Sequence, residues 1–258
     1  MNRLFNIFMV AVLTGLVLFF VVLIVGLVVE LGQESALQAP QGDEIWFAIR
    51  LSLVTATVAS LLALLVSLPV AYFLSRNRFP GKDLLDTLLD LPIVLSPVAL
   101  GAMLLIFFNT PLGELIDRRF GPFVFEVKGI ILAQFFVVLG LAIRLLKTAF
   151  EGIDPEYENL ARTLGYNRFE VFWRVVLRMA APGLLTTFLL IWGRAIGEFG
   201  ATVTLAGATT LKTETLPVAI YLNFESADIS SALVFILILI GISLSILFLV
   251  RKVDVFQR

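Results

Sequence analysis

The stretch ENLARTLGYNRFEVFWRVVLR (residues 158–178) interrupts a chain that is otherwise built from long apolar runs. It carries four Arg, two Glu and a single Gly near its centre, whereas the residues before and after it are mostly Leu, Val, Ile and Phe. Long apolar runs are typical of membrane crossings. The contrast therefore indicates a polar helix–Gly–helix segment placed between two crossings.

The overall composition points to the bilayer as solvent. Of the 258 residues 59% are hydrophobic, and the mean hydropathy is +1.00. A soluble domain of this size cannot bury so much apolar surface. The chain has no Cys and no His, which excludes disulfides, thiolate and imidazole catalysis and the usual zinc sites. We therefore expect no catalytic residue and no metal site in this chain, and the net charge of −1 argues against nucleic acid as a partner.

Six apolar runs are candidate spans, at residues 4–29, 46–74, 88–109, 129–149, 183–207 and 229–250. The first would reach roughly 39 Å as a helix, enough to cross the hydrocarbon core with some tilt. A cleaved signal peptide is the alternative for this run, but its length and the lack of an A-x-A site favour an uncleaved anchor. Only helices and closed barrels satisfy their backbone in lipid. The prediction is an all-α polytopic protein with six transmembrane helices in a single domain, 1–258.

The distribution of Lys and Arg predicts the orientation. Segment 30–45 has acidic residues but no Lys or Arg, and the loop 208–228 has only Lys212. Basic residues gather instead at 76–82, at 144–178 and in the tail from Arg251 to Arg258. Positive charge favours the cytoplasmic side, so both termini and the 158–178 stretch are predicted to be cytoplasmic.

Local signals divide the polar segment into two helices. Asp154 followed by Pro155 is a typical helix start, and Gly165 is suited to a left-handed helix end. Asn167 with Glu170 three residues later has the spacing of a capping box for a second helix. On that second helix an apolar face is predicted, comprising Phe169, Phe172, Val176 and Met179.

Two interpretations of this segment stay open on the residues alone. Basic amphipathic helices often lie on lipid headgroups. The other interpretation is a docking element for a soluble partner: Ala161 and Gly165 form a small-residue patch that allows close approach. The acidic start of the first helix would also be repelled by anionic lipid.

The spacing Glu-x-x-Ala-x-x-x-Gly, followed by an apolar pair at Val175 and Leu177, resembles the EAA loop of ABC-transporter permeases. Asn159, Leu160 and Arg178 depart from that family's consensus. The resemblance implies a type I importer permease fold in which a cytoplasmic coupling segment, 150–180, fits a groove of a separate ATPase. The residues that it would assign to ATPase coupling are Glu158, Ala161, Arg162, Leu164, Gly165 and Tyr166.

Three further stretches are similar to the permeases of molybdate and tungstate importers, with sulfate permeases close behind: LPIVLSPVALGAMLL (91–105), RAIGEFGATVTLAG (194–207) and KTETLPVAIY (212–221). The resemblance implies an inner-membrane subunit that pairs with a second copy, two ATPase subunits and an extracytoplasmic oxyanion-binding protein. ATP and Mg would then belong to the ATPase, and this chain would hold no cofactor. Sulfate transport and an ATP-independent secondary transporter are the alternatives.

The candidates for a translocation pathway are Arg194, Glu198, Thr202 and Thr204. Arg194 and Glu198 are spaced i, i+4 in the fifth span, where an unpaired charge is costly. They form either an internal ion pair that stabilises the bundle or a site that helps an anion to pass. The hydroxyls of Thr202 and Thr204 would line a path or bond to their own helix.

Proline and glycine add local expectations. Ser96-Pro97 and Pro69 are each predicted to open a break in their span, because proline lacks the amide hydrogen of a helix bond. Gly193 and Gly197 form a GxxxG pattern, typical of close helix packing. Residues 213–217 are predicted to lie in an outer loop or re-entrant turn, either solvated or against the binding protein.

Overall fold

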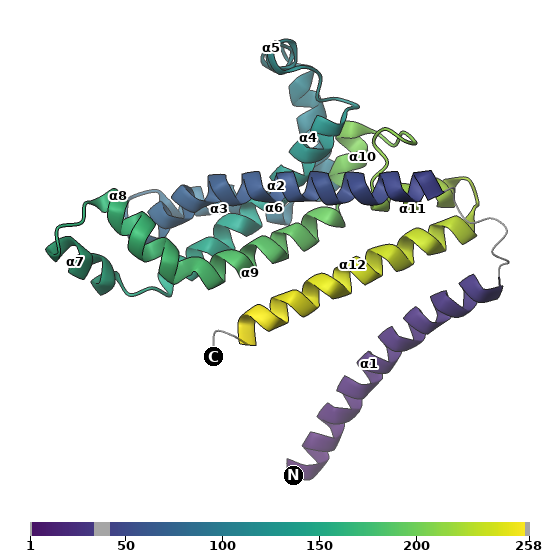
Figure 1. Cartoon of the computed structure of the whole chain (residues 1–258), viewed down its shortest axis with the longest axis horizontal. Coiled ribbons are helices and arrows are strands. Elements are labelled where there is room, and N and C mark those ends of the chain that lie inside the picture. Colours follow the sequence, from purple (N-terminus) through teal and green to yellow (C-terminus); the bar gives the residue numbers. More distant parts are fainter. Residues whose placement is uncertain (1, 34–41, 256–258) are drawn as a thin grey trace.

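The computed structural model describes residues 2–33 and 42–255, and the regular elements within them are all helices (Figure 1). Five helical stretches are long and apolar enough to cross a membrane: α1 (Asn2–Gln33), α2 (Gly42–Arg76), α6 (Val127–Glu151), residues Arg168–Ile196, and α12 (Ile229–Val255). A bent pair supplies the sixth if it is counted as one span. The all-α polytopic prediction is confirmed. Residues 34–41 and Arg258, which entered the charge argument, lie outside the described residues.

Small side chains hold the bundle together. The buried face of α2 is formed largely by Ala and Ser, at Ala48, Ser52, Ala56, Ala59, Ser60, Ala63, Ser67 and Ala71. Such residues let helix backbones approach closely where lipid provides no hydrophobic drive for association. Helix α6 packs along this face, and α9 (Leu177–Ile196) completes the core through Ile191, Ala195 and Ile196.

The third span is broken where the sequence predicted it. Helix α3 (Lys82–Val94) ends just before Ser96, and α4 (Pro97–Phe108) starts at Pro97 after a bend of 106°. The Ser96 hydroxyl accepts a hydrogen bond from the amide of Ala99, which satisfies one of the free donors at the start of α4. Helix α2, in contrast, continues through Pro69, so the break predicted there is wrong.

The fifth span is not the continuous helix expected at 183–207. Helix α9 starts earlier, continues through Pro182 and ends at Ile196, and a short helix, α10 (Gly200–Ala206), follows after the break. The predicted outer loops also contain helices, α5 (Pro111–Phe120) and α11 (Leu216–Glu225). Thr213, Thr215 and Leu216 are fully buried beside α11, so the solvated or partner-facing loop predicted for them is wrong.

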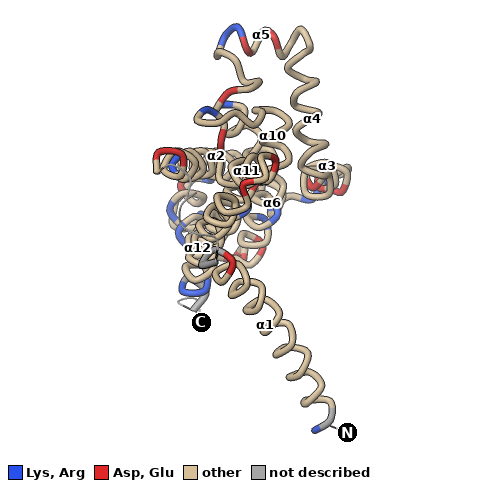
Figure 2. The backbone as a smooth tube through the Cα atoms, turned by 90° about the vertical axis from the view of Figure 1, so that its right-hand side faces the viewer, with Lys and Arg blue, Asp and Glu red and all other residues tan. Residues whose placement is uncertain are grey.

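Helix α1 stands apart from the bundle, next to α12 (Figures 1 and 2). No part of its most apolar stretch is buried. Figure 2 shows that α1 and α4 are free of charged residues along most of their length, whereas α5 carries both signs. The long axis of the molecule in Figure 1 runs from α11 at one end to the loop helices α7 (Pro155–Thr163) and α8 (Arg168–Val171) at the other.

Candidate functional site

The polar hairpin of α7 and α8 folds as its capping residues predict. The Asp154 carboxylate accepts a hydrogen bond from the Glu156 amide at 2.9 Å, and Pro155 occupies the first helical position. Gly165 follows the helix in the left-handed region, with φ of +92°. Asn167 and Glu170 form the reciprocal capping box, with both hydrogen bonds present. These local predictions are confirmed.

Helix α7 presents two different faces. Glu158 and Ala161 are buried against the bundle, with only 4% and 5% of their surfaces exposed. Tyr157, Leu160 and Leu164 lie on the other side and are exposed, Leu164 to 80%. Exposed apolar patches on otherwise polar helices are typical of contact surfaces. Of the remaining coupling candidates, Arg162 and Gly165 are exposed, and Tyr166 is half-buried with the Arg174 guanidinium 5.5 Å from its ring.

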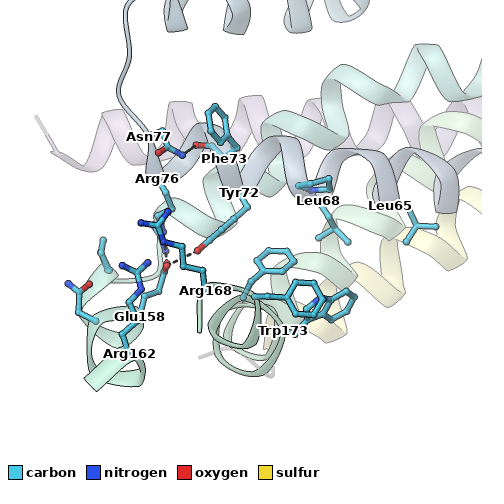
Figure 3. Close-up of a pocket in the computed structure, with 15 residues that line it drawn as sticks. Leu65, Leu68, Tyr72, Phe73, Arg76, Asn77, Glu158, Arg162, Arg168 and Trp173 are labelled. Carbon is cyan, nitrogen blue, oxygen red and sulfur yellow. Dashed lines mark hydrogen bonds and ion pairs between the residues drawn. The ribbon is translucent and has the colours of Figure 1, made fainter. Parts of the chain in front are cut away.

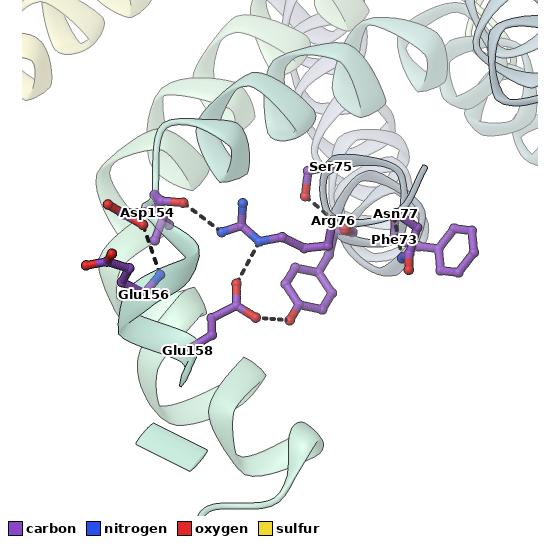
Figure 4. Close-up of polar contacts among 9 residues, drawn as sticks. Phe73, Ser75, Arg76, Asn77, Asp154, Glu156 and Glu158 are labelled. Atoms are coloured by element: carbon purple, nitrogen blue, oxygen red, sulfur yellow. Dashed lines mark hydrogen bonds and ion pairs between the residues drawn. The ribbon is translucent and has the colours of Figure 1, made fainter. Parts of the chain in front are cut away.

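Glu158 faces inward because α2 holds it (Figure 4). One carboxylate oxygen lies 2.6 Å from the Arg76 guanidinium, and the other accepts a hydrogen bond from the Tyr72 hydroxyl at 2.7 Å. Arg76 also donates to the carbonyl of Ile153, just before α7, at 2.9 Å. These contacts fasten α7 to the end of α2. Sequence reasoning missed Arg76 and Tyr72, since no local signal connects residues more than 80 positions apart.

The connection from α8 to α9 contains a π-helical turn, η2 (Phe172–Val176). Val171 and Val176 are buried in a cluster with Ala71, Leu146 and Phe150 of α2 and α6. The single apolar face predicted for this helix is therefore not kept together: Val176 is buried, whereas Phe169 and Met179 are exposed. A π turn shifts the helical register by one residue, which separates positions that an α-helix would align.

The predicted pair of Arg194 and Glu198 is present at the break between α9 and α10. Their charged groups are 2.6 Å apart, and Glu198 is buried while Arg194 is partly exposed. The second Glu198 oxygen accepts a hydrogen bond from the amide of Ala201 at 2.9 Å. Glu198 thus bridges the break: it pairs with Arg194 in the last turn of α9 and satisfies a free donor at the start of α10.

The two threonines differ. The Thr204 hydroxyl donates to the carbonyl of Gly200 at 2.7 Å, so it bonds to its own helix. Thr202 is fully buried, and its hydroxyl has no hydrogen-bond partner among the described residues. A Cβ added to Gly193 would lie 3.5 Å from the Ile246 side chain of α12, an ordinary contact between packed helices.

The breaks in the third and fifth spans lie against each other. A Cβ added to Gly200 would be 3.1 Å from the amide nitrogen of Val98, at the start of α4. A Cβ added to Gly101 would be 2.8 Å from the Cα of Ala201. Discontinuous helices that meet within a membrane bundle are a feature of transport pathways, because their backbone ends line the path. The geometry places Arg194 and Glu198 next to such a junction.

A carboxylate is buried just before α11. Glu214 accepts a hydrogen bond from the Leu211 amide at 2.9 Å and is 3% exposed. Burial raises the pKa of Glu214, the charge of Glu44 raises it further, and the hydrogen bond opposes them. Lys212, the basic residue of this loop, pairs instead with Glu126 at 2.7 Å.

Comparison with known proteins agrees with this architecture. Residues 63–255 match the family described as "Binding-protein-dependent transport system inner membrane component". The chain is 38% identical to the molybdenum transport system permease protein ModB of Escherichia coli (strain K12), over 69% of this chain and 80% of that protein. It is 34% identical to the sulfate transport system permease protein CysW of Synechocystis sp., over 83% and 79%.

A solved structure shares the fold. A chain of a bacterial alginate ABC transporter, crystallised with its alginate-bound periplasmic protein, superposes with a TM-score of 0.72 at 16% identity, covering 93% of this chain and 91% of that one. The family match, the bundle with its broken spans and the polar hairpin agree with one another. The chain belongs to the binding-protein-dependent ABC transporter permeases, the multi-pass inner-membrane components of these transport systems.

Proposed function

We propose that this permease forms the membrane passage for a tetrahedral oxyanion, with molybdate as the substrate, and that a separate ATPase subunit drives it. The observation that carries the choice of substrate is the 38% identity to a molybdenum transport permease. Sulfate is the second candidate, because a sulfate permease is 34% identical over more of this chain. Tungstate is expected to share the route of molybdate, since the two are tetrahedral dianions.

The exposed face of α7 is the proposed contact for the ATPase. Tyr157, Leu160 and Leu164 together offer an apolar surface that a soluble subunit would cover. Gly165 adds no side chain beside Leu164, which favours close approach. Two copies of the chain and two ATPase subunits would complete the assembly, with the hairpin and both termini on the cytoplasmic side. In Figure 1 the C-terminal end of α12 lies toward the end of the molecule that holds α7, as this orientation requires.

Movement of α7 would reach the spans along two connections. The first is the contact of Glu158 with Arg76 and Tyr72 at the end of α2. The second is the continuous backbone from α8 through η2 into α9. Because α9 leads to the break that Glu198 bridges, displacement of the ATPases would reach the junction of the two broken spans. Such rigid-body transmission is the usual route of alternating access.

Arg194 is the proposed contact of the passing anion. In the closed bundle Glu198 neutralises it, so the passage offers no fixed high-affinity site. Weak binding suits transport, because a substrate held tightly would not leave. The buried Thr202 hydroxyl, which has no hydrogen-bond partner within the described part of the chain, is available to hydrogen-bond the anion when the helices separate. Selectivity would then belong mainly to the extracytoplasmic oxyanion-binding protein.

The test is ATP hydrolysis by the assembled complex in vesicles. We expect the rate of ATP hydrolysis to rise when molybdate-loaded binding protein is present on the side of the vesicle membrane where it docks. We expect a smaller rise when sulfate is the only anion. Equal or greater stimulation by sulfate would assign the chain to sulfate transport. Uptake of molybdate by the permease without any ATPase subunit would contradict the proposal and support a secondary transporter.

A further inference from the structure

A hollow of about 910 Å³ lies between the cytoplasmic-side half of α2 and the hairpin of α7, α8 and η2 (Figure 3). Its two ends differ in character. Arg76, Glu158, Arg162 and Arg168 gather at one end, and Leu65, Leu68 and Trp173 lie at the other. The hollow is therefore amphipathic along its length.

The polar end carries a positive charge that the chain does not neutralise. Glu158 is the acidic residue of the lining, and it is already paired with Arg76 at 2.6 Å. Arg162 and Arg168 make no ion pair and no side-chain hydrogen bond within residues 2–33 and 42–255. Two free guanidinium groups facing one hollow favour a ligand with a phosphate or other anionic group.

The apolar end of the hollow is exposed and adjoins a helix long and apolar enough to cross a membrane. Leu65 is 62% exposed and Trp173 53% exposed, and Leu65 belongs to the membrane-crossing helix α2. Tryptophan is enriched at the level of the lipid headgroups. A ligand that fills the hollow must be anionic at one end and apolar at the other.

A soluble protein fits this hollow less well than a lipid does. The exposed apolar side chains of α7 that would meet an ATPase are Tyr157, Leu160 and Leu164, and none of them lines the hollow. The residues of α7 that do line it are Pro155, Glu158, Asn159 and Arg162, at helical spacing on another face. The exposed apolar residues of α7 and its residues in the hollow thus lie on different faces of the helix.

We propose that this hollow, the Arg162–Arg168 site, binds an anionic phospholipid of the leaflet next to α7. The phosphate lies between Arg162 and Arg168, and an acyl chain follows Leu65, Leu68 and Trp173 along α2. The bound lipid joins α7 and α8 to α2, in addition to the Glu158–Arg76 contact. The site does not depend on which anion the permease carries.

The test uses tryptophan fluorescence of the full chain in lipid vesicles. Trp46→Phe and Trp192→Phe leave Trp173 as the remaining one of the three tryptophans. Vesicles contain both phosphatidylglycerol and phosphatidylcholine, and in each preparation only one of the two lipids has brominated acyl chains. Bromine quenches tryptophan fluorescence on contact. Two cationic groups near a lipid phosphate predict about tenfold more efficient quenching by brominated phosphatidylglycerol than by brominated phosphatidylcholine.

Two charge variants separate the site from general attraction to the membrane. Arg162→Gln with Arg168→Gln is expected to make the two lipids equal. Arg118→Gln with Arg119→Gln removes the same charge from α5 and is expected to leave the preference unchanged. Equal quenching in the parent protein would overturn the proposal, even if the first variant did not fold. A preference for phosphatidylglycerol that survives loss of Arg162 and Arg168 would overturn it too. Loss of quenching on addition of the ATPase subunit would also overturn it, and would assign the hollow to the protein partner.

Discussion

Replacing Glu158 by alanine removes two of the three contacts that fasten α7 to α2, those of its carboxylate with Arg76 and Tyr72. The side chain of Glu158 is 5% exposed and that of Arg76 is 14% exposed, so the pair is largely shielded from water. Removing one member of a buried pair is costly mainly because the other charge stays buried without compensation. Arg76 keeps its hydrogen bond to the Ile153 carbonyl and is not fully enclosed, which reduces the penalty. We expect local opening of α7 to become easier by about 2–3 kcal/mol.

Hydrogen exchange of the amides in α7 measures this opening directly. The expected loss corresponds to roughly 30- to 160-fold faster exchange. The matched control is Glu156→Ala, which removes an exposed acid from the same first turn and therefore has a similar effect on the helix dipole. Exchange in Glu158→Ala that is no faster than in Glu156→Ala would refute the reasoning. It would mean that packing of Ala161 and Val171, rather than the ion pair, holds the helix in place.

Three further predictions concern single positions. Gly165→Arg is expected to cost about 1 kcal/mol of backbone strain, because φ is +92°; no steric clash adds to this cost, since no atom lies near the added Cβ. The protein should therefore stay inserted in the membrane but no longer co-purify with the ATPase. Gly101→Ala places a Cβ 2.8 Å from Ala201 and is expected to lower thermal stability by about 1–3 kcal/mol, whereas Gly241→Ala, with open space around it, should not. Glu214→Gln should raise the melting temperature at pH 7. Folding raises the pKa of Glu214 above its ordinary value of 4.5, so at pH values above this pKa the charged carboxylate disfavours the folded state. The gain in melting temperature should therefore vanish as the pH falls below 4.5, where the carboxyl group is protonated in both states. A gain that persists at low pH would contradict this cause.

Local chemistry was the predictable part of the fold. Asp154-Pro155, Gly165 and the Asn167–Glu170 box act within one turn of the chain, and the structure follows them. The break at Ser96-Pro97 is of the same kind, since a serine cap and a proline start act together there. Pro69 has no such cap, and the packing of α2 against α6 keeps the helix continuous through it.

The unpredicted part depends on contacts between distant segments. The apolar run of the fifth span predicts one continuous helix. In the structure Glu198 stabilises a break, because its carboxylate accepts a hydrogen bond from the Ala201 amide and pairs with the Arg194 guanidinium. The predicted coupling residues lie on one short segment, yet Glu158 turns inward because another helix supplies Arg76 and Tyr72. No pattern within either segment reveals such a partner, although the need to neutralise a buried charge predicts that one exists.

The π-helical turn η2 adds one residue, relative to an α-helical turn, to the long helix of residues 168–196. An α-helix advances by about 100° per residue, so losing one residue from α9 would rotate Arg194 away from the junction of the broken spans. A loss within Phe172–Val176 can instead be absorbed, because the π turn relaxes to an ordinary α turn and the helices on both sides keep their orientation. A deletion of one residue is therefore expected to be tolerated within η2, because it leaves the direction of the side chains of α9 unchanged.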